Sequence, residues 1–351
     1  MDDGAIRFFL ASKTERGFVS YFERLLGPEG YGAVILKGGP GSGKSTLMKK
    51  IGSALLQQGH TVEFIPCASD PDSLDAIIDR TTRRAMIDGT APHMLDPVYP
   101  GARDTLLNAG DAWDGALLRA HMPEIIRLSD EANACHAQAS AFIAAAGALL
   151  ARCRTIAARY VDEGAVRAAA QLRLPEGSQG AGAVEYRLLS AVSVGRVEFF
   201  HETLGALCKD MTAVPDEWGA ASELLLARVA AAARDAGERI ILCPCSLFAQ
   251  KTDHVLLPER GLAFTAANRF HDAASGTTHL IEGLYRPIPE READAMRSLL
   301  FHAGELIVRA QSQVALSKAI HDELERYYVA AMDFSKLDVI YDQAMELLMG
   351  N

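Results

Sequence analysis

The strongest constraint in the sequence is a repeat, because residues 8–93 align with residues 186–271 in a single register without a gap. The segments "TVEFIPC" and "RIILCPC" both end in Pro-Cys, and a histidine follows each cysteine at the same spacing. A repeat of this length predicts two related α/β halves that arose by duplication. The identical pairs are Leu10/Leu188, Ser12/Ser190, Gly17/Gly195, Val19/Val197, Phe22/Phe200, Leu26/Leu204, Gly27/Gly205, Gly41/Gly219, Leu47/Leu225, Ala54/Ala232, Gly59/Gly237, Pro66/Pro244, Cys67/Cys245, Asp75/Asp253, Ala85/Ala263 and His93/His271.

The size and composition of the chain suit two globular domains. It has 351 residues, of which 49% are hydrophobic and 23% are charged. Its net charge of -10 makes a nucleic-acid-binding surface over the whole protein unexpected. We identify no uninterrupted apolar window of about 18 residues and therefore expect no membrane span. The six cysteines do not suggest a disulfide scaffold, so we expect a reduced, cytoplasmic protein.

A phosphate-binding motif lies in the first copy. Residues 38–45, "GGPGSGKS", fit G-x-x-x-x-G-K-[ST] between a predicted strand (residues 31–37) and a predicted helix that stops at Gly59. Glycines let the backbone N–H groups approach phosphate oxygens, Lys44 supplies a positive charge to the β and γ phosphates, and Ser45 offers a hydroxyl to Mg²⁺. The expected nucleotide-binding residues are Gly38, Gly39, Pro40, Gly41, Ser42, Gly43, Lys44, Ser45 and Thr46.

A second acid is expected on the magnesium side of such a site. The run Ala85, Met86, Ile87 predicts a short strand that ends in Asp88, the pattern of a Walker B aspartate. We therefore predict Ser45 and Asp88 as metal ligands, and Lys44 and Asp88 as catalytic residues; a turn or cap role for Asp88 is the alternative. Gly89 follows Asp88, where many hydrolases carry a catalytic glutamate, and this argues against a fast ATPase.

The second copy has lost the groups that would bind phosphate. Lys44 aligns with Ser222, Ser45 with Glu223 and Asp88 with Ala266. Glu223, together with Asp216 and Glu217, would repel a phosphate. The strand before this loop has also degraded, to "MTAVP". The second copy therefore reads as a pseudo-NTPase that keeps its layers without the ligand site.

Helical segments follow each α/β half. Residues 115–173 are alanine-rich with helical spacing, and residues 289–350 are also strongly helical. Each segment either packs on its own half or acts as a lever between halves. The expected domain order is an α/β domain (1–112), a helical segment (113–174), a linker (175–182), a degenerate α/β domain (183–287) and a C-terminal helical segment (288–351).

Several other residues are weaker candidates. His93 lies in the proline-rich loop 90–104 after Asp88, where it would sense the γ-phosphate, but His271 survives in the copy without the site and favours a structural role. Cys67 and Cys245 read as buried thiols rather than metal ligands. Asp70, Asp72 and Asp75 are candidates to accept a proton from a phosphoryl acceptor. The alternative is that Ser69 or Asp70 caps a following helix, and Asp75 reads as structural. The candidate transition-state cations are Lys13, Arg16, Arg80, Arg83 and Arg84.

Three motifs together resemble one family. "KGGPGSGKSTLMKKIG", "PCASDPDSLD" and "DGTAPHMLDPVYPG" resemble an uncharacterised bacterial family of duplicated P-loop ATPase-like proteins, over nearly the full chain. The resemblance implies a tandem P-loop fold and ATP binding, and it implies no particular reaction.

The sequence thus predicts a three-layer P-loop NTPase fold, internally duplicated, with one competent Mg²⁺–ATP site in the first half. We expect slow or partner-stimulated ATP hydrolysis. The alternatives are a kinase that phosphorylates a small acceptor, and a non-catalytic ATP-dependent switch that acts on a protein partner or a second copy of the chain. The absence of an N-K-x-D guanine signature near the P-loop favours ATP over GTP.

Overall fold

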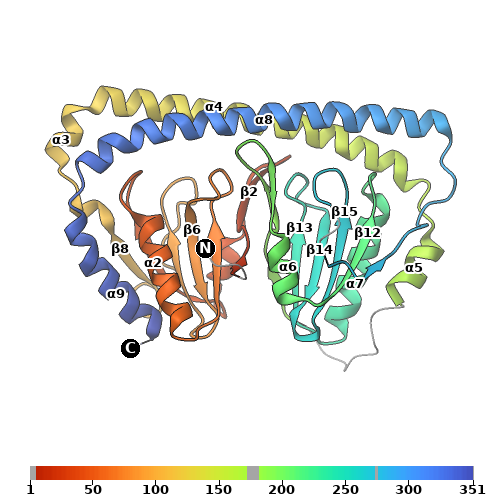
Figure 1. Cartoon of the computed structure of the whole chain (residues 1–351), viewed down its shortest axis with the longest axis horizontal. Helices are drawn as coiled ribbons and strands as arrows, with labels where there is room; N and C mark the ends of the chain where they lie inside the picture. The colour runs from red at the N-terminus through yellow and green to blue at the C-terminus, as the bar shows by residue number, and fades with distance from the viewer. Residues whose placement is uncertain (1–4, 172–181, 273–275, 351) are drawn as a thin grey trace.

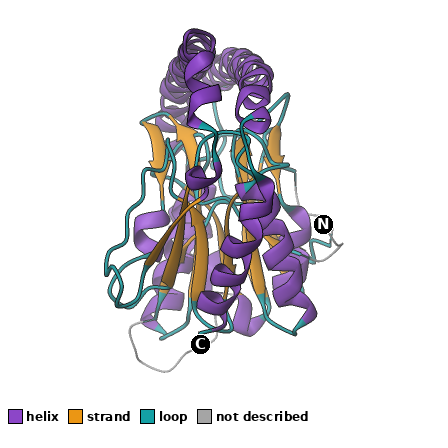
Figure 2. Cartoon of the chain, turned by 90° about the vertical axis from the view of Figure 1, so that its left-hand side faces the viewer, coloured by secondary structure: helices purple, strands orange, loops and turns teal. Residues whose placement is uncertain are grey.

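The computed structural model describes residues 5–171, 182–272 and 276–350. Two α/β halves stand side by side, and two long helices lie across both of them (Figure 1). In the view turned by 90°, the same two helices lie above the sheets (Figure 2). The predicted linker, residues 175–182, lies outside the described residues except for Gly182.

The first half contains a six-stranded mixed sheet with the order β1-β5-β6-β7-β4-β8. The central strand β4 is buried along nearly its whole length and pairs in parallel with β7 and β8, whereas β6 is antiparallel to both of its neighbours. Such a continuous apolar strand is typical of a sheet covered on both faces. The bounds are β1 Ile6–Arg7, β4 Gly32–Lys37, β5 Val62–Pro66, β6 Leu74–Asp79, β7 Arg84–Asp88 and β8 Thr105–Asn108.

The second half contains a six-stranded sheet with the order β9-β13-β14-β15-β12-β16. Each strand has the same parallel or antiparallel neighbours as its counterpart in the first sheet. The bounds are β9 Val184–Tyr186, β12 Asp210–Pro215, β13 Ile240–Pro244, β14 Thr252–Leu257, β15 Leu262–Ala267 and β16 His279–Leu280.

The prediction that the strand before the second loop has degraded is wrong. β12 is a six-residue strand, as long as β4. Its ladder is complete because β15 pairs with all six residues on one side and β16 pairs on the other. Ala213 and Val214 are buried, so small apolar side chains are sufficient to fill this part of the sheet.

Short elements fill the space between the sheets. They are the hairpins β2 Ala11–Thr14 with β3 Gly17–Ser20 and β10 Ser190–Val192 with β11 Val197–Phe199, and the helices α1 Phe22–Leu25 and α6 His201–Leu207. The inner faces of both sheets join these elements in one hydrophobic core, which includes Ile35 from the first sheet and Ile241 from the second. At its centre, the rings of Phe9 and Phe200 stack with centroids 4.6 Å apart.

The outer face of each sheet is covered by one central helix and one helix from the other half. In the first half these are α2 Lys44–Gln57 and α9 Leu337–Met349; in the second they are α7 Ala220–Asp235 and α5 Glu163–Gln171. Within the described residues, helices occupy most of the predicted segments 115–173 and 289–350. The long helix of each segment lies across both halves, and the last helix, α5 or α9, packs on the opposite half, so neither segment packs only on its own half.

The two long helices connect the halves. They are α4 Met122–Ala158 and α8 Glu290–Ala330, and α3 Gly115–Ala120 precedes α4. Their antiparallel packing is fixed at one end by the ion pair between Arg159 and Glu292 and, nearer the other, by the bond from Ser317 Oγ to the carbonyl of Ala132. The remaining elements are the 3-10 turns η1 Ala109–Ala112, η2 Pro258–Arg260 and η3 Phe334–Lys336.

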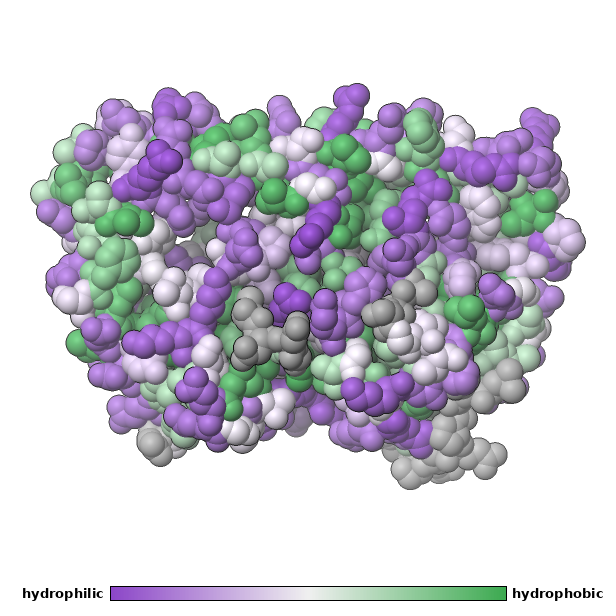
Figure 3. Space-filling model, viewed as in Figure 1, coloured by the Kyte–Doolittle hydropathy of each residue, from purple (hydrophilic) through white to green (hydrophobic). Residues whose placement is uncertain are grey.

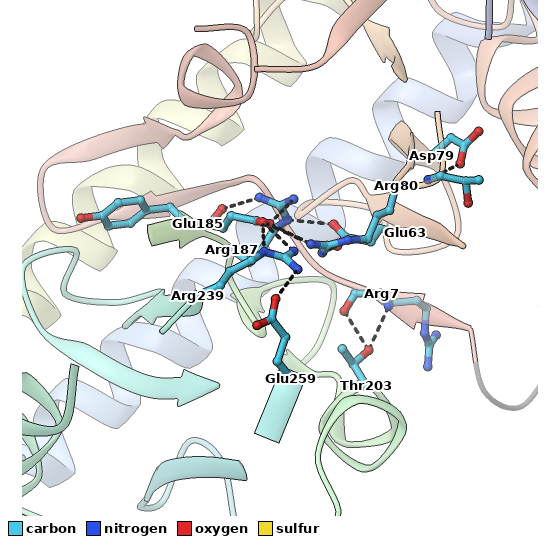
Figure 4. Close-up of polar contacts among 11 residues, drawn as sticks. Arg7, Glu63, Asp79, Arg80, Glu185, Arg187, Thr203, Arg239 and Glu259 are labelled. Atoms are coloured by element: carbon cyan, nitrogen blue, oxygen red, sulfur yellow. Dashed lines mark hydrogen bonds and ion pairs between the residues drawn. The ribbon is translucent and has the colours of Figure 1, made fainter. Parts of the chain in front are cut away.

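Polar groups also join the two sheets. The backbones of Phe9 and Leu188 exchange two hydrogen bonds of 2.7 and 2.8 Å. Beside them, the fully buried carboxylate of Glu63 is paired with the guanidinium groups of Arg80 and Arg187 (Figure 4). Burial raises the pKa of Glu63, but Arg187 and Arg80 outweigh this effect and hold its pKa below the usual value. The junction therefore depends on a buried, ionised network.

Helix α4 is long and apolar enough, by length and composition, to cross a membrane. The sequence reading did not anticipate this, because much of its apolarity comes from alanine. A helix in a protein core passes the same test, and here α4 packs along α8, with Ile143 and Ala146 in a shared core. On the face seen in Figure 3, hydrophobic and hydrophilic side chains are interspersed over these helices.

Candidate functional site

The predicted phosphate loop, residues 38–43, connects the end of β4 to the start of α2. Gly41 and Gly43 have φ angles of 63° and 80°, which favour glycine because a side chain is strained there. Gly43 is the residue before α2, and the helix begins at Lys44. The loop thus ends at a helix N-terminus, where free N–H groups favour an anion.

Lys44 folds back over the loop. Its Nζ atom donates to the carbonyls of Gly38 (2.5 Å) and Gly39 (2.8 Å), and lies 3.4 Å from Ser42 Oγ. The same ammonium lies 3.6 Å from Asp88 Oδ2, with both side chains largely buried. The structure therefore brings together Lys44 and Asp88, which the sequence assigned to one site from positions far apart in the chain.

Asp88 is the last residue of β7, and β7 is parallel to β4 with Asp88 opposite Leu36. Its Oδ1 accepts hydrogen bonds from the backbone N–H of Thr90 (2.9 Å) and from the Thr90 hydroxyl. Ser45 Oγ accepts a bond of 2.9 Å from the N–H of Leu74. Mg²⁺ prefers a few oxygen ligands from the protein with the rest from phosphate and water, and the Ser45 hydroxyl and Asp88 carboxylate fit that requirement.

The C-terminal part of the chain covers the loop. A Cβ placed on Gly41 would lie 2.9 Å from Val329 Cγ2, and one on Gly43 would lie 2.8 Å from Leu337 Cδ1. The carboxylate of Glu325 accepts a 3.3 Å hydrogen bond from the N–H of Gly41. The His321 side chain lowers the pKa of Glu325 and burial raises it, and the net shift is downward. An anion from the chain itself therefore sits on the loop that was predicted to bind one.

Other candidates lie at the same edge of the first sheet. His93 Nε2 is 3.1 Å from Asp75 Oδ2, and its Nδ1 is buried without a partner. Burial lowers the pKa of His93, but Asp75 and Asp88 raise it above its usual value. Lys13 Nζ donates to Ser69 Oγ at 2.9 Å. The loop 90–104 contains no helix or strand, as predicted.

The expectation of a helix capped by Asp70 is wrong, because residues 70–73 form a turn that leads into the strand β6. Ser73 N–H donates to the carbonyl of Asp70, and Ser73 Oγ donates to its carboxylate at 2.8 Å. Asp72 is exposed. Lys318 from α8 lies 3.6 Å from Asp70, so the long helix contacts this turn as well as the loop.

The arginine candidates are not brought to the site. Arg84 begins β7 and Asp88 ends it, so Arg80, Arg83 and Arg84 lie at the opposite edge of the sheet. Arg80 belongs to the Glu63 network, and Arg83 donates to the carbonyl of Glu29 at 2.6 Å. Arg16 is exposed in the turn between β2 and β3.

In the second half, the chain's own groups occupy the corresponding helix N-terminus. Asp216 Oδ1 accepts from the N–H groups of Trp218 (3.1 Å) and Gly219 (2.9 Å), and its Oδ2 accepts from Ser222 N–H at 2.7 Å. The hydroxyl of Tyr285 accepts from Ala220 N–H (3.2 Å) and Ala221 N–H (2.9 Å) and donates to Asp216 at 2.8 Å.

The repulsion of phosphate by Asp216 and Glu223 stays a prediction, and the structure gives both side chains partners within the protein. Asp216 takes the place of an external anion, and Glu223 is paired with Arg154 at 3.0 Å. The gap-free alignment also fails here, because the left-handed residue before α7 is Gly219, which corresponds to Gly43 rather than Gly41. The second loop is shorter, and only its backbone hydrogen bonds, which sequence patterns do not display, reveal the role of Asp216.

The sequence matches no protein-family model, and searches of curated proteins and of solved structures find no similar chain. The site must therefore be interpreted from its own geometry. Within the described residues, the first half offers a loop at a helix N-terminus with a lysine and an aspartate 3.6 Å apart, and the second half offers a helix N-terminus that is already saturated.

Proposed function

We propose that this protein binds Mg²⁺–ATP at one site, the loop 38–45 of the first half, and is a P-loop NTPase with slow or partner-stimulated hydrolysis. The observation that carries the proposal is the convergence of Lys44 and Asp88, 3.6 Å apart, at a glycine loop that opens a helix. The resemblance to duplicated P-loop ATPase-like proteins supports the same assignment.

The residues of the loop have separate roles in this proposal. The Lys44 ammonium exchanges the carbonyls of Gly38 and Gly39 for phosphate oxygens, which are stronger acceptors because they are charged. Ser45 and Asp88 would hold Mg²⁺, which neutralises phosphate charge when it is bound. Thr90 fixes the Asp88 carboxylate through two hydrogen bonds, so that this acid is oriented before the nucleotide arrives.

We further propose that the second half is a degenerate copy. The equal strand order of the two sheets supports a duplication, and the Asp216–Tyr285 pair supports the loss of the ligand. A buried carboxylate that accepts three backbone N–H groups leaves none of them for a phosphate, and its charge would repel one. The protein would then bind one nucleotide per chain.

The cover over the loop favours a second candidate function, an ATP-dependent switch. Glu325 and Val329 contact Gly41 directly, so a triphosphate that binds the loop must displace the end of α8. Because α8 also packs on α4 across both halves, such a displacement would alter the surface offered to a protein partner or a second copy. In the kinase alternative, an acceptor would bind beside the Asp75–His93 pair, which lies at the same edge of the sheet.

Nucleotide titration of the full chain tests the proposal. Lys44→Ala should abolish ATP binding measured by calorimetry with Mg²⁺ present. Ser222→Ala, at the position that the gap-free alignment matches to Lys44, should bind ATP like the parent, because the Ser222 hydroxyl has no hydrogen-bond partner among the described residues. Wild-type affinity in Lys44→Ala would refute the site, and two bound nucleotides per chain would refute the degenerate second half.

Single-turnover kinetics distinguishes hydrolysis, phosphoryl transfer to an acceptor, and ATP binding without turnover. Release of phosphate to water supports hydrolysis, and transfer to an added small acceptor supports a kinase. Tight binding without turnover, together with increased proteolytic sensitivity of residues 325–337 in the presence of ATP, supports the switch. Unchanged sensitivity of this segment when ATP is bound would contradict the switch.

A further inference from the structure

Three potential metal ligands meet in the interior of the second half. Asp253 and His254 are neighbours on β14, and His271 lies in the loop after β15. One ligand atom from each lies within 4.8 Å of the others, and all three residues are buried. None of them belongs to the nucleotide site proposed above, which lies in the first half.

Among the residues that the structure describes, two ring nitrogens in this cluster have no hydrogen-bond partner. His254 Nδ1 is bonded to Thr265 Oγ1 at 2.8 Å, which fixes the ring, but His254 Nε2 is buried and unpaired. His271 Nδ1 is also buried and unpaired. A buried polar atom without a partner destabilises a fold by about 1–3 kcal/mol. Of the two, the unpaired Nε2 of His254 favours a bound ligand, because His271 meets Asp253 through its other nitrogen, Nε2, and the matched His93 of the first half also has an unpaired Nδ1.

The arrangement of the atoms suits a metal ion. Asp253 Oδ2 and His271 Nε2 are 3.2 Å apart. Two ligands that each lie about 2.1 Å from one tetrahedral ion are separated by about 3.4 Å. The bond to Thr265 also leaves the other nitrogen of His254 available, the arrangement usual for metal-bound histidines.

The set of ligand atoms indicates which class of ion would fit. Two imidazole nitrogens and one carboxylate favour Zn²⁺ or a similar transition metal over Mg²⁺ or Ca²⁺.

One group in the cluster competes with a cation. The Lys251 ammonium is ion-paired with Asp253 Oδ1, while Oδ2 faces His271. A metal bound to Oδ2 would have to share the carboxylate with this ammonium. Lys251 therefore weakens the site without blocking it, and its removal should strengthen metal binding.

The first half lacks two members of this cluster. Its Asp75–His93 pair corresponds to Asp253–His271 and has the same contact, at 3.1 Å. Ala76 stands where the second half has His254, and Ser73 stands where it has Lys251. An aspartate–histidine pair thus suffices for the fold, and the third ligand is particular to the second half.

We propose that Asp253, His254 and His271 form a binding site for a divalent transition metal ion such as Zn²⁺, with the remaining coordination positions taken by water or another small ligand.

The test is a Zn²⁺ titration of the full chain after treatment with a chelator, followed by calorimetry, elemental analysis and thermal unfolding. We expect one Zn²⁺ per chain and a raised unfolding temperature, and no such effect of Mg²⁺ at the same concentration. His254→Ala, which installs the first-half residue, should weaken binding at least about tenfold. His254→Gln is the second variant, in case a cavity disturbs the fold. His93→Ala removes the matched histidine of the first half and should leave Zn²⁺ binding unchanged.

Lys251→Ser separates a metal site from a purely structural cluster. This variant should bind Zn²⁺ at least about tenfold more tightly than the parent. Because its buried Asp253 carboxylate has lost an ion-pair partner, the fold should be less stable, and Zn²⁺ should restore that stability. Failure of the parent and of Lys251→Ser to bind Zn²⁺, or equal binding by the parent and both His254 variants, would overturn the proposal. Lys44→Ala should retain Zn²⁺, so this result is independent of the nucleotide site.

Discussion

The carboxylate of Glu325 accepts a hydrogen bond of 3.3 Å from the backbone N–H of Gly41, although 284 positions separate the two residues in the chain. Glu325 lies near the end of α8, which starts in the second half of the molecule and crosses to the first. Glu325, which covers the proposed nucleotide-binding loop, therefore belongs to the helix that spans both halves. This contact places a negative charge where the proposed function requires a phosphate.

Removal of this charge should strengthen ATP binding. In Glu325→Gln the amide oxygen still accepts from Gly41, but the ionised carboxylate no longer competes with the phosphates. Glu325 is partly exposed, so we expect an increase in affinity of about two- to tenfold, measured by calorimetry with Mg²⁺–ATP.

Glu323→Gln is the matched control. Glu323 lies on the same helix and is about half exposed, and its one ion pair within the described part of the chain is with Arg127 at 3.9 Å. The change in formal charge is identical, so a general electrostatic effect would appear in both variants. Equal effects of the two substitutions, or weaker ATP binding in Glu325→Gln, would contradict an inhibitory role for the Gly41 contact.

Loss of Asp216 should destabilise the second half and expose an anion site. Asp216→Ala leaves three backbone N–H groups at the start of α7 without their acceptor, and the loss of such a cap costs about 1–2 kcal/mol. The freed N–H groups, with Lys251 beside Gly219, should then accept inorganic phosphate.

Urea unfolding with and without phosphate measures this effect. Phosphate should stabilise Asp216→Ala more than the parent, and Asp216→Asn should give an intermediate result because its amide oxygen still accepts hydrogen bonds. If Asp216→Ala is as stable as the parent, the carboxylate does not fill the anion position.

The sequence predicted those features that depend on local patterns. Strand, glycine loop and helix follow one another in residues 31–59, and the structure has them in that order. The two-copy alignment located β13 at the position that β5 has in the first half, whereas the strand β12 was wrongly interpreted as degraded. Asp88 was identified because an apolar run before an acid predicts a strand end, and the structure places this strand beside β4.

Features that depend on contacts between distant segments were not predicted. Nothing in the spacing of residues 289–350 shows that Glu325 reaches Gly41, since helical periodicity gives a buried face but not its partner. The helices α5 and α9 each pack on the opposite half because α4 and α8 run from one half to the other. Asp216 was read as repulsive because its charge is visible in the sequence, while its three N–H donors are set by the backbone.

The pair between Glu63 and Arg187 should hold the two halves together. Arg187 is almost fully buried and its Nε donates to Glu63 at 2.9 Å. Arg187→Met leaves the buried Glu63 carboxylate with only Arg80 as a charged partner, and removal of one member of a buried pair costs about 3–5 kcal/mol.

A double variant isolates this pair in urea unfolding. Glu63→Gln/Arg187→Met removes both charges and should be less destabilised than Arg187→Met alone. Arg239→Met is the control at the rim of the same network, where Arg239 contacts Glu185, and it should cost at most about 1 kcal/mol. A double variant less stable than Arg187→Met would show that the paired charge is not what matters.

The same carboxylate should make the protein sensitive to acid. Burial raises the pKa of Glu63, but Arg187 and Arg80 lower it by a larger amount. The folded pKa therefore lies below the unfolded value of about 4.3. A group with a depressed folded pKa stabilises the native state fully above the unfolded pKa, and this contribution disappears as the pH falls through the folded pKa. The free energy of unfolding of the parent should therefore decrease steeply below about pH 4.3. Glu63→Gln cannot titrate at this position, so its curve should be flatter over the same range, and parallel curves for the two proteins would show that the pKa of Glu63 is not depressed in the native state.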